Sequence, residues 1–206
     1  MSRERILLAT TNRGKVREIK KFLADLPIEI VGLRDLGIRT TFRERGKTFR
    51  ENARGKSLFY SRKSKILTLA EDSGLEVHQL DGAPGIYSAR FSGRGANDEK
   101  NLQKVLRLLE SVPAGKRKAT FVSCLALAKD GRTIREIRGE VTGRIARGKK
   151  GRFGFGYDPI FYYPPLRKNF AELRPAEKNR VSHRGRALRK LRSYLVRYLA
   201  ASHAHS

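Results

Sequence analysis

Short apolar runs alternate with amphipathic segments along nearly the whole chain, and this alternation predicts an α/β fold. Each run has the length of a strand, and several of the segments between them repeat apolar residues at the spacing of a helix. The predicted strands cover 6–9, 28–33, 66–70, 120–128 and 133–141, and the predicted helices begin near 13, 48, 97 and 182. We expect a single mixed-sheet αβ domain over residues 1–200, with two lobes around a central cleft, and a frayed tail over 201–206.

Composition excludes several other classes of protein. No apolar run approaches the roughly 18 residues of a membrane span, and charged residues interrupt the N-terminus too early for a secretory signal. The lone cysteine, Cys124, has no internal disulfide partner, and no set of cysteines and histidines has the spacing of a zinc site. We therefore expect a cytoplasmic protein without a disulfide scaffold or a thiolate zinc site.

The chain is strongly basic, with 46 Lys and Arg against 20 Asp and Glu and a net charge of +26. A field of this sign concentrates polyanions, whether nucleic acid, phosphorylated small molecules or an anionic membrane, and charge alone does not choose among them. The C-terminal helix has arginines on its polar side, but its stripe of leucines is explained more simply by packing in the core. We expect no membrane partner, and nucleic acid only as a non-specific charge effect.

A polar turn follows the first predicted strand and leads into a helix. Backbone N–H groups at a helix start, threonine hydroxyls and a lysine together suit an anion such as phosphate. The glycine spacing differs from that of the common nucleotide-binding loops, and an ordinary capped helix is the alternative interpretation. The residues of this candidate phosphate site are Thr10, Thr11, Asn12, Arg13, Gly14 and Lys15.

Two adjacent carboxylates, Glu71 and Asp72, end the apolar strand that begins at residue 66. Neighbouring side chains of a strand point to opposite faces, so one carboxylate faces a ligand while the other turns inward or meets a basic group. Magnesium prefers a few carboxylates together with phosphate oxygens and water. The pair is therefore a candidate Mg²⁺ site, with Glu44 and Glu51 as further acidic candidates, and a turn with solvated acids is the alternative.

Phenylalanines and glycines alternate in the string FGFGYDP, residues 153–159. Glycine allows close approach of the backbone to a ligand, and an aromatic ring offers a face on which a base can stack. An aromatic core beneath a glycine turn would give the same pattern. A donor-rich helix start, with Lys178, His183 and Arg184, lies further along the chain.

Taken in order, these clusters resemble the signature of the inosine/xanthosine triphosphate pyrophosphatases, enzymes that remove noncanonical purine nucleotides. The resemblance extends from Ile6 to about Leu199, and its longest string joins the acidic pair to the glycine-rich segment that follows. The strings that carry it are LLATTNRGKVREIKKFL, TFRENARGKS, AEDSGLEVHQLDGAPGIYSARFSG, GRFGFGYDPIF and FAELRPAEKNRVSHRGRAL.

The resemblance implies that a homodimer catalyses Mg²⁺-dependent attack of water on the α-phosphorus of ITP, dITP or XTP, which releases pyrophosphate. Asp72 would be the general base and a metal ligand, Glu44 the second metal ligand, and Glu71 a supporting acid. The phosphates would contact Thr10, Thr11, Asn12, Arg13, Gly14, Lys15 and Lys56, and Ser73 would also contact the substrate. The purine would be surrounded by Phe155, Gly156, Tyr157, Asp158, Lys178, His183 and Arg184.

Base selectivity would depend on Arg184 as a hydrogen-bond donor. Inosine and xanthosine carry a 6-oxo acceptor, whereas adenine would present an amino donor to the arginine. Mismatched buried polar groups can discriminate between substrates by about 10⁴ or more. Guanine shares the 6-oxo edge, so this contact does not explain how guanine is rejected.

The chain departs from the family pattern at Thr11, where glycine is common, and at Glu71, where a second aspartate is common. Two alternatives stay open: a basic nucleic-acid-binding protein without catalysis, and a related pyrophosphatase that acts on modified pyrimidine or methylated nucleotides. Against the first, the chain has no helix-turn-helix, zinc-finger or RNA-recognition string.

Overall fold

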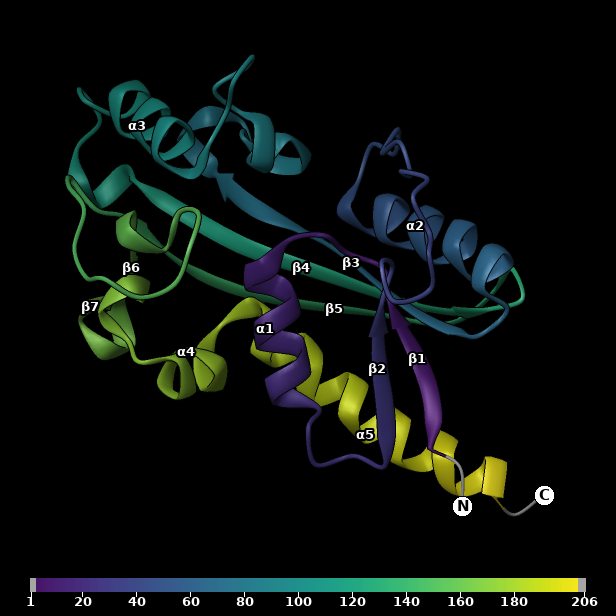
Figure 1. Cartoon of the computed structure of the whole chain (residues 1–206). Coiled ribbons are helices and arrows are strands. Elements are labelled where there is room, and N and C mark those ends of the chain that lie inside the picture. Colours follow the sequence, from purple (N-terminus) through teal and green to yellow (C-terminus); the bar gives the residue numbers. More distant parts are fainter. Residues whose placement is uncertain (1–2, 204–206) are drawn as a thin grey trace. The chain divides into compact units, whose positions relative to one another are not determined.

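The computed structural model describes residues 3–203, which form seven strands, five α-helices and several short 3₁₀ turns (Figure 1). The strands are β1 Glu4–Leu8, β2 Ile28–Gly32, β3 Leu67–Val77, β4 Lys118–Lys129, β5 Arg132–Ile145, β6 Phe161–Tyr163 and β7 Lys168–Asn169. The helices are α1 Arg13–Phe22, α2 Phe49–Ser64, α3 Asp98–Leu108, α4 Pro175–Val181 and α5 His183–His203. No helix among these described residues is long and apolar enough to cross a membrane.

The strands form one mixed sheet in the order β2-β1-β3-β4-β5-β6-β7. Strand β1 pairs in parallel with both β2 and β3, whereas β6 pairs antiparallel with β5 and β7. Strands β4 and β5 are joined through Asp130 and Gly131, whose φ angles are 49° and 73°. Positive φ at both turn residues suits a tight hairpin. The predicted mixed-sheet α/β fold class is confirmed.

The chain divides into two compact units, and neither unit is one continuous stretch. Unit 1 comprises Met1–Asp72, Cys124–Gly139 and Arg186–Ser206, and unit 2 comprises Ser73–Ser123 and Glu140–Gly185. The number of units agrees with the two lobes that we expected from the sequence.

Unit 1 has helices on both faces of its strands, because successive residues of β1 point to opposite sides. Ile6 and Leu8 pack in a cluster with Leu191 of α5 and with residues of α1, whereas Leu7 packs in a second cluster with Tyr60 of α2. Figure 1 shows α2 on one side of β1 and β3, with α1 and α5 on the other. Complete burial of each such leucine contributes roughly 1.5–3 kcal/mol to stability.

Unit 2 has its own core. Leu102 and Val105 of α3 pack with apolar residues of the strands, and the cluster includes the rings of Phe121, Phe161 and Phe170. The centroids of Phe161 and Phe170 are 4.8 Å apart. Tyr157 of the glycine-rich string 153–159 belongs to the same cluster.

The predicted helix starts are confirmed by side-chain caps. Thr48 accepts a hydrogen bond from the N–H of Glu51, Asn97 from that of Lys100, and Ser182 from that of Gly185. The predicted tail over 201–206 is described only in part: α5 continues through residues 201–203, and residues 204–206 lie outside the described chain.

The predicted end of the third strand is wrong. Strand β3 does not stop at the acidic pair but continues through Glu71 and Asp72 to Val77. Its neighbours in the sheet are β4 and β1, and the pairing with β1 covers its first residues, Leu67–Leu69. Glu71 is 0% exposed and Asp72 is 6% exposed. The carboxylates therefore lie in the interior of a buried strand and not in a solvated turn.

Candidate active site

The phosphate turn predicted from the sequence lies between β1 and α1. The side chain of Asn12 caps α1, since its Oδ1 accepts a hydrogen bond from the N–H of Lys15 at 3.0 Å. The N–H of Asn12 in turn donates to Oγ1 of Thr10 at 3.2 Å. The capped-helix interpretation is thus correct for Asn12, and the same geometry leaves the start of a ten-residue helix as a favourable place for an anion.

Asp72 lies among charged and polar groups of unit 1. Nδ2 of Asn52, on α2, donates to Oδ2 of Asp72 at 3.0 Å. Burial raises the pKa of Asp72, and the negative charge of Glu44 raises it further, whereas Lys15 and Lys56 lower it. The structure therefore brings together four of the residues that we selected from the sequence. A buried carboxylate with a raised pKa is a good general base, because it accepts a proton more readily than an exposed aspartate.

Lys56 connects the loop residue Glu44 to the backbone of β3. Its Nζ forms an ion pair with Glu44 and also donates to the backbone carbonyl of Glu71 at 3.4 Å. Lys56 comes from α2 and Glu44 from the loop before that helix. The contact with Glu44 means that Lys56 neutralises an acidic side chain in addition to the phosphate role that the resemblance implies.

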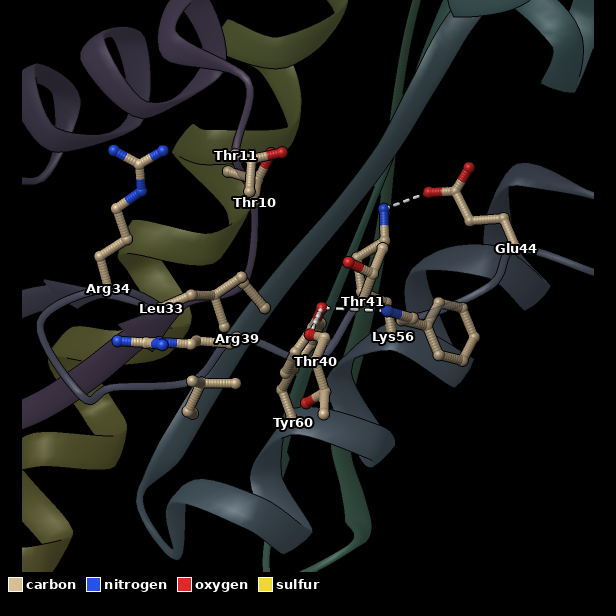
Figure 2. Close-up of a pocket in the computed structure, with 13 residues that line it drawn as sticks. Thr10, Thr11, Leu33, Arg34, Arg39, Thr40, Thr41, Glu44, Lys56 and Tyr60 are labelled. Carbon is tan, nitrogen blue, oxygen red and sulfur yellow. Dashed lines mark hydrogen bonds and ion pairs between the residues drawn. The ribbon is translucent and has the colours of Figure 1, made fainter.

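A cavity of about 440 Å³ in unit 1 contains part of the predicted phosphate site (Figure 2). Asn12, Arg13, Gly14, Lys15 and Asp72 are described by the structure but do not line it. The lining residues are Ala9, Thr10, Thr11, Leu33, Arg34, Ile38, Arg39, Thr40, Thr41, Phe42, Glu44, Lys56 and Tyr60. Four of them, Thr10, Thr11, Glu44 and Lys56, are predicted site residues.

The predicted purine-binding residues of unit 2 gather around Phe155. Nζ of Lys178 lies 4.8 Å from the centroid of the Phe155 ring, and Cζ of Arg184 lies 5.4 Å from the same centroid. Nη2 of Arg184 also donates to Oγ of Ser73 at 3.1 Å. Both cations are nearly inaccessible, with 3% and 2% of their surface exposed. The half-buried ring of Phe155 therefore offers a flat face to a ligand, with two cations held beside it.

Asp158 connects Lys178 to the backbone of Phe155. Its Oδ2 accepts hydrogen bonds from Nζ of Lys178 at 2.6 Å and from the backbone N–H of Phe155 at 2.9 Å. Gly154 has a φ of 79°, and a Cβ at that position would clash with the carboxylate of Asp158. The glycine is therefore needed for the loop to close over Asp158.

Two other predicted base-binding residues point into the core of unit 2. Tyr157 is buried and donates its hydroxyl hydrogen to the backbone carbonyl of Ser88 at 2.8 Å. Burial also raises the pKa of Tyr157 above its ordinary value. The ring of His183 stacks on Phe121 with centroids 4.6 Å apart and planes inclined by 11°. The side chain of Tyr157 therefore fits the alternative interpretation of the FGFGYDP string, an aromatic core beneath a glycine turn.

Sequence reasoning missed two residues that position the site. Asn52 holds Asp72, and Asp98 accepts a hydrogen bond from the N–H of Gly156 at 2.8 Å. The sequence held one signal for Asn52, because asparagine is an unfavourable residue in the interior of a helix. Asp98 gave no such signal, since an acid in the first turn of α3 is explained by the helix dipole alone.

The acidic residues of unit 1 fit a magnesium ion. Among the described residues no group of three or more His, Cys, Asp and Glu side chains forms a complete metal cage. Asp72 and Glu44 nevertheless lie near enough for the charge of Glu44 to raise the pKa of Asp72. Mg²⁺ is usually held by one or two carboxylates together with substrate phosphates and water, so two carboxylates suffice.

Comparison with known proteins shows one consistent relationship. The sequence profile of the Ham1 family matches residues 6–194. The dITP/XTP pyrophosphatase of Thermoanaerobacter pseudethanolicus is 44% identical over 196 residues, which cover 95% of this chain and 98% of that protein. Solved structures are also similar. A HAM1 protein from Coxiella burnetii has a TM-score of 0.86 and 38% identity, and the match covers 94% of this chain and 99% of that one. The Ham1 protein of Staphylococcus aureus has a TM-score of 0.84 and 38% identity, and the match covers 93% of this chain and 98% of that one.

Proposed function

Because the chain belongs to the Ham1 family, we propose that it hydrolyses the noncanonical purine nucleoside triphosphates ITP, dITP and XTP to the monophosphate and pyrophosphate. The observation that carries this proposal is the buried Asp72 carboxylate, with its raised pKa, in the field of Lys15, Lys56 and Glu44. This group has the acid–base character and the cationic surroundings that hydrolysis of a phosphoanhydride needs.

In the chemical step, Asp72 takes a proton from water as the water oxygen attacks the α-phosphorus. Lys15 and Lys56 neutralise negative charge on the phosphates, and Asn52 holds the base in position through its hydrogen bond. General-base catalysis of this kind contributes about 10²–10⁴ to a rate. Asp72 and Glu44 would hold Mg²⁺, which neutralises phosphate charge and makes the phosphorus a better electrophile.

Base recognition falls to the group around Phe155. The ring stacks on the purine, and Arg184, oriented by Ser73, donates to the 6-oxo group that inosine and xanthosine share. Adenine has an amino donor at that position, so an N–H of the buried guanidinium would face another donor, which costs binding energy. Lys178 is already held by Asp158 and supplies a second fixed cation beside the ring.

We also propose that the protein acts in the cytoplasm as a homodimer and that residues 1–200 form the catalytic domain, as the family resemblance implies. Hydrolysis in the cytoplasm would keep deaminated purines out of the pools used for DNA and RNA synthesis.

The direct test is pyrophosphate release from ITP, dITP, XTP, GTP and ATP at matched enzyme concentration, with and without Mg²⁺. We expect rapid hydrolysis of the first three only with the metal, and one monophosphate for each pyrophosphate. Release of single phosphates would contradict attack at the α-phosphorus. Equal rates with all five substrates would contradict the role of Arg184.

A further inference from the structure

Two arginines of the unit 1 cavity take no part in the function proposed above. Arg34 and Arg39 come from the loop between β2 and α2, and both line the cavity. Figure 2 shows their guanidinium groups on the side of the cavity opposite Glu44, with Thr10 and Thr11 between. The cavity therefore has a second cationic wall, separate from Lys56.

The charge of the lining favours an anionic ligand. Its charged residues are Arg34, Arg39, Lys56 and Glu44. Three of these side chains are cationic and one is acidic, so the lining has a net positive charge, although Lys56 is ion-paired with Glu44. Hydroxyl groups of Thr10 and Thr11 add neutral donors. Guanidinium groups bind phosphate oxygens in a bidentate manner, which makes a phosphate the best match to this wall.

The backbone of the loop is held in place. The hydroxyl of Tyr60, on α2, accepts from the N–H of Phe42 at 3.1 Å and donates to the carbonyl of Thr40 at 3.0 Å. Earlier in the loop, the N–H of Ile38 donates to the carbonyl of Leu33 at 2.9 Å. These bonds flank Arg39 on both sides. An arginine on a fixed backbone loses less conformational entropy when it binds a ligand.

The position of the cavity indicates which phosphates it would hold. Glu44 and Lys56 interact with Asp72 and also line the cavity, whereas Asp72 does not line it. A triphosphate attacked beside Asp72 would therefore extend past Glu44 and Lys56 toward the arginines. We propose that Arg34 and Arg39 bind the β,γ-diphosphate end of the substrate, the part that leaves as pyrophosphate; this inference rests on the proposed function.

The arginines would then assist departure of the leaving group. When the water oxygen bonds to the α-phosphorus, the bond from that phosphorus to the bridging oxygen breaks, and its electron pair stays on pyrophosphate. The proton of the water goes to Asp72. Negative charge grows on the diphosphate, where two guanidinium groups stabilise it through charge-assisted hydrogen bonds.

The test uses Arg34→Gln, Arg39→Gln and the double variant, with Arg43→Gln/Arg45→Gln as the matched control. The control removes the same two charges from the same loop at positions that do not line the cavity. Calorimetry measures the binding of inorganic pyrophosphate and of dIMP in metal-free buffer, and circular dichroism confirms folding. We expect each single variant to weaken pyrophosphate binding about tenfold, and the double variant more, with dIMP binding unchanged. The control should bind pyrophosphate like the wild type.

Three outcomes would overturn the inference. These are absence of pyrophosphate binding by the wild type, equal losses in the double variant and the control, and loss of dIMP binding with pyrophosphate binding retained. The first two would mean that no local site exists, and the third that the cavity holds the nucleoside. A wild-type protein that binds pyrophosphate through these arginines but hydrolyses no triphosphate would instead contradict the proposed function alone.

Discussion

Asp72 combines burial, which raises its pKa, with polar and cationic neighbours, which lower it. It is buried enough for its pKa to be raised, yet Lys15, Lys56 and Asn52 favour its ionised form. The proton affinity of the carboxylate therefore stays above that of an exposed aspartate, while the two lysines and the amide limit the rise of its pKa.

Replacement of this carboxylate separates catalysis from folding. We expect Asp72→Asn to lower kcat about 10²–10⁴-fold, because the amide cannot accept the proton of water. The amide has the same shape and can still accept the hydrogen bond from Asn52, so the variant should fold. Its thermal unfolding temperature should equal or exceed that of the wild type, because a buried ionised group is removed. Turnover near the wild-type level would eliminate Asp72 as the base.

Arg184 gives a second prediction at the level of one side chain. We expect Arg184→Ala to reduce the ratio of kcat/KM for dITP over dATP at least tenfold, because the donor to the 6-oxo group is lost. The ratio is the quantity to measure, since loss of the contacts with Ser73 and Phe155 lowers both values. An unchanged ratio would show that another group reads the base.

At the level of elements, α2 connects the loop that precedes it to β3. Oδ1 of Asn52 accepts from the N–H of Gly46 at 2.8 Å, and Nδ2 of the same residue donates to Asp72. One amide therefore fixes the end of the loop between β2 and α2 and the proposed base together. The helix supplies Lys56 one turn further along the same element.

This connection predicts a shift in pH dependence. The base must be ionised, so kcat/KM falls as the pH decreases through the pKa of Asp72, and the fall should lie above the ordinary aspartate value of about 3.9. The hydrogen bond from Asn52 lowers that pKa, so Asn52→Ala should move the fall to higher pH and lower kcat several-fold. Ser57→Ala is the control, because the hydroxyl of this buried serine of α2 donates to the carbonyl of Arg54 in the same helix. A pH profile identical to that of the wild type would leave Asn52 with a purely structural role.

Periodicity and capping residues were sufficient to predict most helices, because these signals are local. The end of β3 was not predictable in the same way. An acidic pair normally ends a strand, and no local pattern shows that Glu71 and Asp72 lie inside a strand that continues to Val77. The candidate site shows the same division. The residue types indicated Asp72 and Arg184, and the family resemblance indicated Lys56, whereas the orientation of Tyr157 depends on a core built from distant segments.

At the scale of the whole molecule, the net charge of +26 should act on the rate of encounter with substrate. We expect kcat/KM for dITP to fall several-fold between roughly 50 and 500 mM KCl, with kcat nearly constant, because salt screens long-range attraction. Binding of duplex DNA should be weak and steeply salt-dependent, without preference for sequence. If kcat falls in parallel with kcat/KM, salt acts on the catalytic step and not on capture.

The division into two discontinuous units also sets an order for assembly during synthesis of the chain. All buried residues of the unit 2 core precede residue 174, whereas the main cluster of unit 1 includes Leu188, Leu191, Leu195 and Leu199 of α5. A ribosome releases the chain from its N-terminus, so the first strands of unit 1 emerge early but wait for their last helix. Unit 2 can therefore complete its core while unit 1, which contains the proposed base, is still open.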